Sequence, residues 1–98
     1  MDEVTRDALD RLLELADSDT GQSRRAANFI LAWWNAESLG GFDIAELFAV
    51  DVSVSQDMSR VFNYLATRRE AIYPDDRQPQ IDAIIRRWRP EVWERARS

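Results

Sequence analysis

The stretch DEVTRDALDRLLELAD, residues 2–17, decides the fold that the sequence predicts. Its apolar residues recur at steps of three and four, which is the period of an amphipathic α-helix. They are Val4, Ala8, Leu9, Leu12, Leu13, Leu15 and Ala16. Because such a helix must bury its apolar stripe against other elements, we expect it to pack against further helices.

The following residues continue the helical pattern. Asp19 or Thr20 can cap a second helix over residues 22–37 with a side-chain oxygen. The middle of that helix, residues 29–34, is apolar all round, so we expect it at the centre of the bundle. The Gly-Gly pair at 40–41 ends the helix, because glycine tolerates left-handed backbone angles.

Two capping patterns predict a short helix and then a long one. Asp43 with Glu46, and Ser53 with Gln56, have the spacing of a capping box, in which each side chain bonds the backbone of the other residue. We therefore expect the long helix to begin near Val54. Its apolar residues form the most regular stripe in the chain: Val54, Met58, Val61, Phe62, Leu65 and Ala66.

Prolines delimit the last elements. Pro74 indicates a turn over residues 73–76, and Pro79 suits the first turn of a fifth helix that carries Ile81, Ile84, Ile85 and Trp88 inward. Pro90 ends that helix, and residues 90–96 predict one further turn. Since no alternating strand pattern persists, we expect an all-α fold: a compact bundle of four to five helices that forms a single domain over residues 1–98.

The residue types favour binding over catalysis. The chain has no histidine, cysteine or lysine, the side chains that most often act as acid, base, nucleophile or soft metal ligand near neutral pH. We therefore expect no enzymatic activity, no catalytic residue, no metal and no cofactor. No apolar stretch approaches the ~20 residues of a membrane span, and no signal segment opens the chain, so we expect a cytoplasmic protein without membrane contact.

Acidic residues define the most distinct surface feature. In residues 2–17, five carboxylates recur at steps of three and four and should form one ridge of roughly 20 Å along the first helix. They are Glu3, Asp7, Asp10, Glu14 and Asp17. This ridge can meet a basic groove of a protein partner or imitate a phosphate backbone. The alternative is a solvated helix face with ordinary i, i+4 pairs such as Arg6 with Asp10 and Asp7 with Arg11.

The C-terminal part of the chain interleaves arginine with tryptophan. Arg86, Arg87 and Arg89 surround Trp88, and Trp93 follows. Such a pattern occurs on nucleic-acid surfaces, but Trp88 continues an apolar stripe and the pI of about 4.6 opposes direct binding of nucleic acid. We expect the arginines to be exposed or paired with acids of the first helix, and we keep Arg86, Arg87, Arg89 and Trp93 as candidate protein contacts.

Two neighbouring tryptophans give a further candidate contact. Trp33 and Trp34 point about 100° apart on a helix, so at most one lies squarely on a given face. One should be core, and the other, for which we name Trp33, either packs on another helix or contacts a partner.

Two other functions stay open. Residues 44–65 faintly resemble a helix-turn-helix, which would make the protein a small DNA-binding regulator, although its second helix carries Asp57 beside a single Arg60. The third interpretation is a structural homodimer that joins exposed tryptophans across a two-fold axis.

Three runs carry a resemblance to a known group of proteins. They are ALDRLLELA (8–16), AANFILAWWNAESLGGFD (26–43) and IIRRWRPEVW (84–93), and they resemble a family of short, uncharacterised, all-helical bacterial proteins associated with integrative and conjugative elements. These are packing and capping residues, so the resemblance carries over no active site. It implies a mobile-element setting, in which small acidic proteins can inhibit host defence by blocking a nucleic-acid groove, as anti-CRISPR proteins do. We expect a non-enzymatic protein-interaction module. A specific version of this expectation is such an inhibitor.

Overall fold

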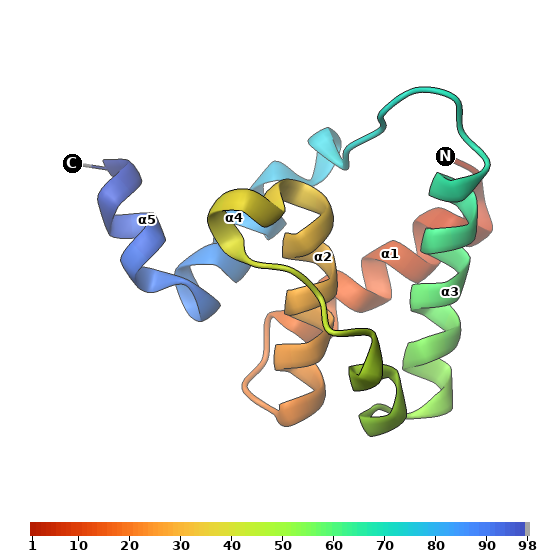
Figure 1. Cartoon of the computed structure of the whole chain (residues 1–98), viewed down its shortest axis with the longest axis horizontal. Coiled ribbons are helices and arrows are strands. Elements are labelled where there is room, and N and C mark those ends of the chain that lie inside the picture. The colour runs from red at the N-terminus through yellow and green to blue at the C-terminus, as the bar shows by residue number, and fades with distance from the viewer. Residues whose placement is uncertain (98) are drawn as a thin grey trace.

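Every regular element among residues 1–97, which the computed structural model describes, is helical (Figure 1). This confirms the all-α fold, and residue 98 of the predicted domain lies outside the described residues. In chain order the elements are α1 (Glu3–Ala16), α2 (Gly21–Leu39), the 3-10 helix η1 (Ile44–Ala49), α3 (Val52–Ala66), the 3-10 helix η2 (Asp75–Arg77), α4 (Gln78–Trp88) and α5 (Pro90–Arg97). The radius of gyration, 12.9 Å, is that of a compact chain of this length.

Helix α1 takes the central position that the sequence had assigned to α2. It packs against α2, α3 and α4, and it buries an apolar stripe that includes Leu9, Leu12 and Leu13. The Asp2 carboxylate caps the helix by accepting a hydrogen bond from the Thr5 backbone N–H at 2.8 Å. Hydrogen bonding from Thr5, first from its side chain and second from this backbone N–H, lowers the pKa of Asp2, because it favours the charged carboxylate.

Helix α2 begins and ends where the sequence indicates. The Thr20 hydroxyl caps its first turn by accepting from the Ser23 N–H at 3.0 Å. Gly40 ends it with a positive φ of 94°, a backbone angle that side chains resist. Its buried face includes Ile30 and Leu31, and the helix is interrupted at Asn35, where the backbone leaves helical angles.

Both predicted capping boxes are wrong in detail. The Asp43 carboxylate caps η1 by accepting from the Ala45 N–H at 3.0 Å, but Glu46 turns away and bonds α2 instead. Helix α3 starts at Val52 rather than near Val54, because Asp51 is the N-cap residue and its carbonyl accepts from the N–H groups of residues 54 and 55. The box of Ser53 with Gln56 is therefore not formed.

The apolar stripe of α3 is only partly buried. Met58 and Val61 lie in the core, whereas Phe62 is 65% exposed and Ala66 is exposed too. Periodicity correctly places these residues near one face, but no element covers the Phe62 edge of that face. The predicted helical stripe is therefore present, but it is not buried along its whole width.

The last helices return to α1 and α2. The Trp33 indole Nε1 donates to the Ile72 carbonyl at 2.8 Å, which holds the segment between α3 and α4 against α2. Pro79 lies in the first turn of α4 as expected. Residues 90–97 form a complete helix, α5, where the sequence indicated only one turn.

The central position of α1 gives a stability prediction. Leu12→Ala should lower the free energy of unfolding by about 2–5 kcal/mol, because Leu12 is 1% exposed and its loss leaves a cavity among packed helices. Val4→Ala, on the same helix but 60% exposed, is the matched control and should change it by less than about 0.5 kcal/mol. Urea denaturation followed by circular dichroism measures both, and equal losses would contradict the central role of α1.

Candidate functional site

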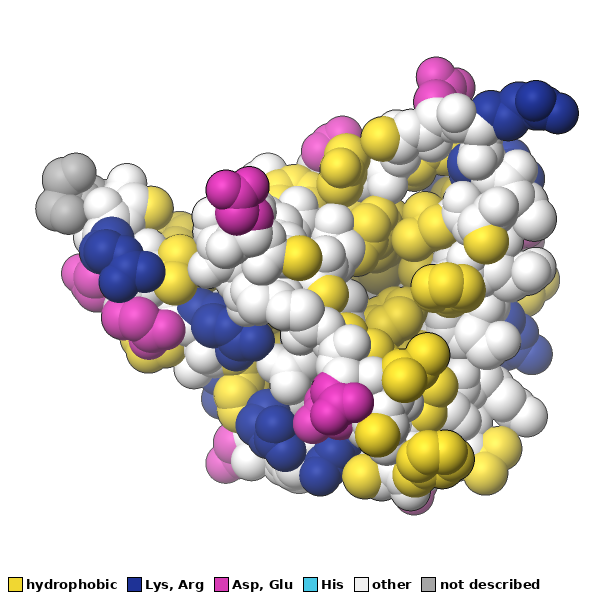
Figure 2. Space-filling view, viewed as in Figure 1, with side chains coloured by type: hydrophobic (Ala, Val, Ile, Leu, Met, Phe, Trp, Pro, Cys, Tyr) yellow, Lys and Arg dark blue, Asp and Glu magenta, His cyan; other side chains and the backbone are white. Residues whose placement is uncertain are grey.

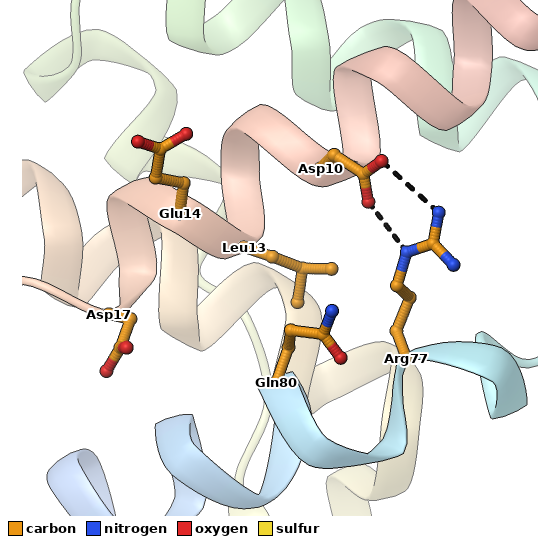
Figure 3. A pocket seen from close by; sticks show the side chains of 6 residues that line it. All are labelled: Asp10, Leu13, Glu14, Asp17, Arg77 and Gln80. Atoms are coloured by element: carbon orange, nitrogen blue, oxygen red, sulfur yellow. Dashed lines mark hydrogen bonds and ion pairs between the residues drawn. The ribbon is translucent and has the colours of Figure 1, made fainter.

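The five predicted carboxylates of α1 all lie on its exposed side. We call Glu3, Asp7, Asp10, Glu14 and Asp17 the acidic ridge. Its C-terminal half borders a shallow pocket of about 360 Å³, which Asp10, Glu14 and Asp17 line together with Arg77 and Gln80. In Figure 3 the Asp10 carboxylate points to the Arg77 guanidinium, whereas the Glu14 carboxylate points away from it.

Arginines of the C-terminal half neutralise part of the acidic ridge. Arg77 binds the Asp10 carboxylate through two nitrogens at 2.7 and 3.2 Å, and Arg87 Nε donates to Asp17 at 3.3 Å. The hydrogen bonds that Arg77 donates to the Asp10 carboxylate raise the pKa of Arg77. We expected Arg86, Arg87 and Arg89 to be exposed or paired with acids of the first helix. This is confirmed for Arg87, which pairs with Asp17, and for exposed Arg86, but it is wrong for half-buried Arg89, which bonds α2.

The i, i+4 pairs expected within α1 are not formed. The Arg6 side chain donates to the Met1 carbonyl, and the Arg11 side chain binds Asp57 of α3. Within the described residues, Glu3, Asp7 and Glu14 make no ion pair or side-chain hydrogen bond. These three carboxylates are therefore the part of the acidic ridge that is open to a partner.

The Arg and Trp residues near the C-terminus have different surroundings. Arg86 is exposed and its guanidinium lies 4.9 Å from the ring centre of Trp93. Trp93 packs against the core, and no partner is found for its buried indole nitrogen. Trp88 also packs against the core and donates its Nε1 hydrogen to the Ala16 carbonyl at 2.7 Å, as its place in the apolar stripe indicates.

Arg89 fastens the C-terminal half to α2. Its Nε donates to the Leu39 carbonyl at 2.7 Å, and another nitrogen donates to Asn28 Oδ1 at 2.8 Å. The Leu39 carbonyl lies at the end of α2, where helical carbonyls lack partners. These hydrogen bonds give Arg89 a structural role, because they hold the C-terminal half of the chain against α2.

Trp33 is half-buried and packs against the core. Its only polar atom already donates to the Ile72 carbonyl. Its neighbour Trp34 is half-buried too and likewise packs against the core. The sequence left two possibilities for Trp33, packing within the chain or contact with a partner. The structure places it against another segment of the same chain.

The predicted helix-turn-helix differs from the observed segment. Its first helix, η1, is a 3-10 helix of six residues. On α3, Asp57 is 7% exposed and accepts two hydrogen bonds from Arg11 at 2.9 and 3.0 Å. That hydrogen bonding raises the pKa of Arg11. The Asp57 side chain therefore serves the contact between α1 and α3.

Three strongly exposed apolar side chains, Phe48, Ile44 and Phe62, line a groove that the sequence did not predict. Figure 2 shows hydrophobic side chains gathered around a hollow between α2 and α3. The hollow has a volume of about 410 Å³. We call it the aromatic groove, and its apolar lining consists of Phe29, Phe42, Ile44, Leu47, Phe48, Met58 and Phe62.

The aromatic groove has an ordered base and an open rim. Met58 is buried at its base, and Phe29 and Phe42 meet edge to face with ring centres 5.4 Å apart. At the rim Phe48 is 93% exposed, Ile44 74% and Phe62 65%. One sequence signal pointed to an exposed apolar side chain here. Leu47 and Phe48 are adjacent in a short helix, and two adjacent side chains cannot both point inward.

The described residues contain no group of three or more acidic side chains that could hold a metal ion, and none of their helices has the length and apolarity of a membrane span. The shallow pocket on the acidic ridge places an arginine and a glutamine beside carboxylates, which suits ion pairing. What the arrangement offers chemically is fixed charge on α1 and apolar surface in the aromatic groove.

Residues 6–89 match DUF7673, a family of unknown function, so the chain belongs to that family. This agrees with the resemblance to uncharacterised helical proteins and shows no link to mobile elements. No curated protein and no solved structure matches the chain.

The bonding of Arg89 predicts a structural effect at a position first considered as a protein contact. Arg89→Lys should lower the free energy of unfolding by about 1–3 kcal/mol, because a lysine cannot reach acceptors on α2 and α4 together. Arg86→Lys is the matched control and should change it by less than about 0.5 kcal/mol, since exposed Arg86 keeps its charge. Urea denaturation measures both, and an unaffected Arg89→Lys protein would show that this residue is dispensable for the fold.

Proposed function

We propose that this member of the DUF7673 family is a non-enzymatic protein-interaction module that binds its partner through the aromatic groove. The observation that carries the proposal is the exposure of Phe48, Phe62 and Ile44 around one hollow. Large apolar residues scattered singly over a surface need no explanation, but a contiguous apolar patch marks an interaction site.

The energetics of the aromatic groove support this function. Burying one such side chain stabilises a complex by about 1.5–3 kcal/mol, so Phe48 and Phe62 together can supply much of the binding energy. The hollow beside them gives a partner side chain a place to enter. Exposed knobs next to a hollow are a typical arrangement of binding hot spots.

The residue inventory supports a role without catalysis. Histidine, cysteine and lysine do not occur, and Glu3, Asp7 and Glu14, which form no ion pair within the described residues, are exposed on the surface of α1. DNA binding receives less support. Asp57, on the helix α3 that would contact DNA, is paired with Arg11, and the net charge of −5 of the chain opposes binding to the phosphate backbone.

In a narrower form of the proposal, the protein comes from a bacterial mobile element and inhibits host defence. The sequence resemblance supports the setting, and the open carboxylates Glu3, Asp7 and Glu14 support the mode of action. In this form the acidic ridge occupies a groove of the target that otherwise binds nucleic acid.

Retention of proteins from a lysate of the source organism tests the proposal. The immobilised protein is compared with three variants: Phe48→Ser with Phe62→Ser in the groove, Glu3→Lys with Asp7→Lys and Glu14→Lys on the acidic ridge, and Val4→Ser as control. We expect a protein that the wild type and control retain and that the groove variant retains at least about tenfold less. Loss with the ridge variant as well would support the narrower form.

Two results would contradict the proposal. In the first, all four proteins retain the same set of lysate proteins in equal amounts. In the second, the purified protein converts a metabolite and loses this activity when one carboxylate is replaced. Circular dichroism of each variant verifies that its helical content is unchanged.

A further inference from the structure

The shape of the aromatic groove indicates what kind of segment fits it. Ser55, Ser59 and Phe62 line one side and lie on one face of α3 at steps of four and three, which spans about 10 Å at 1.5 Å per residue. Ile44 and Phe48 of η1 form the opposite side. An open apolar trough of this length accepts the apolar face of a helix of two to three turns.

The unpaired charges next to residues that line the groove are acidic. Residues 37–57 contain five acidic residues and no arginine. Two of the five, Glu46 and Asp57, are paired with arginines of α1, α2 and α3. Asp43 and Asp51 are exposed and form no ion pair within the described residues.

Asp43 and Asp51 both border the aromatic groove. Asp43 lies between Phe42 and Ile44, which line it. Asp51 lies one turn before Ser55 at the start of α3. A segment in the trough therefore meets carboxylates at the edge of its apolar contact, and lysine or arginine flanking its apolar face complements them.

This charge argues against other occupants. A two-fold axis through the groove of a homodimer would bring the acidic edges of both copies together, and like charges in an interface cost several kcal/mol. Anionic lipid and nucleic acid are repelled for the same reason. A cationic segment is the occupant that both the apolar lining and the carboxylates favour.

We infer that the aromatic groove binds a cationic amphipathic helix of a partner protein. This inference rests on the proposed function and specifies the chemistry of the partner. The apolar face of the helix packs between Phe48 and Phe62, and its basic side chains face Asp43 and Asp51. The mode of binding is the insertion of a helix into a groove.

A synthetic probe tests the inference. It is a labelled peptide of about 14 residues, made of leucine at helical i, i+3, i+4, i+7 positions and lysine elsewhere; the control peptide has glutamate in place of lysine. Fluorescence anisotropy with the full chain should show that the lysine peptide binds at least about tenfold more tightly than the glutamate peptide.

Variants assign the binding to the groove. Phe48→Ser with Phe62→Ser should weaken binding of the lysine peptide about tenfold or more. Asp43→Asn with Asp51→Asn keeps residues that can cap η1 and α3, and should weaken binding and reduce its dependence on salt. Val4→Ser, which changes no charge and lies outside the groove, should leave binding unchanged.

Each failure has a distinct meaning. Lysine-peptide binding that survives both the groove and the Asn variants overturns the inference, and so does the absence of binding to the wild type. A dimer in sedimentation that Phe48→Ser with Phe62→Ser dissociates also overturns it, because the occupant is then a second copy. None of these results affects the lysate comparison, whose failure would instead contradict the proposed function.

Discussion

The fold depends on the apolar stripe of α1, which packs against three other helices. A helix that buries one stripe leaves its opposite side in water, and in α1 that side carries the acidic ridge. The C-terminal half is then attached to α1 by Trp88 on the Ala16 carbonyl and by Arg77 on Asp10. Part of the acidic ridge is therefore paired inside the molecule, and only the rest remains for a partner.

The aromatic groove follows from how the chain passes from α2 to α3. The connection covers residues 40–51 and includes η1, which is held against α2 because Glu46 accepts hydrogen bonds from Arg24 and Asn28. Its far end is fixed by Gln22, which accepts from the Asp51 N–H at 2.7 Å and donates to the Asp51 carboxylate at 3.1 Å. These bonds order the groove before anything binds, which reduces the entropy that a partner must offset.

Periodicity predicted the helices well, since α1, α2 and α4 each show apolar residues at helical steps and clear end signals. It could not show that Phe62 is exposed, because a period identifies a face of a helix but not whether another element covers that face. The role of Arg89 was equally out of reach, because its acceptors at Leu39 and Asn28 are distant in sequence. The acidic ridge was visible as a pattern, whereas the aromatic groove required three segments in their final places.

The acidic surface also affects which partners can reach the aromatic groove. An exposed apolar groove invites a second copy, but every copy carries a net charge of −5 and acidic residues beside the groove, so approaching copies repel each other. Salt screens this repulsion over about 8–10 Å near physiological ionic strength, while apolar attraction persists. The carboxylates thus select between partners by charge, and the apolar lining supplies most of the binding energy once a cationic segment has arrived.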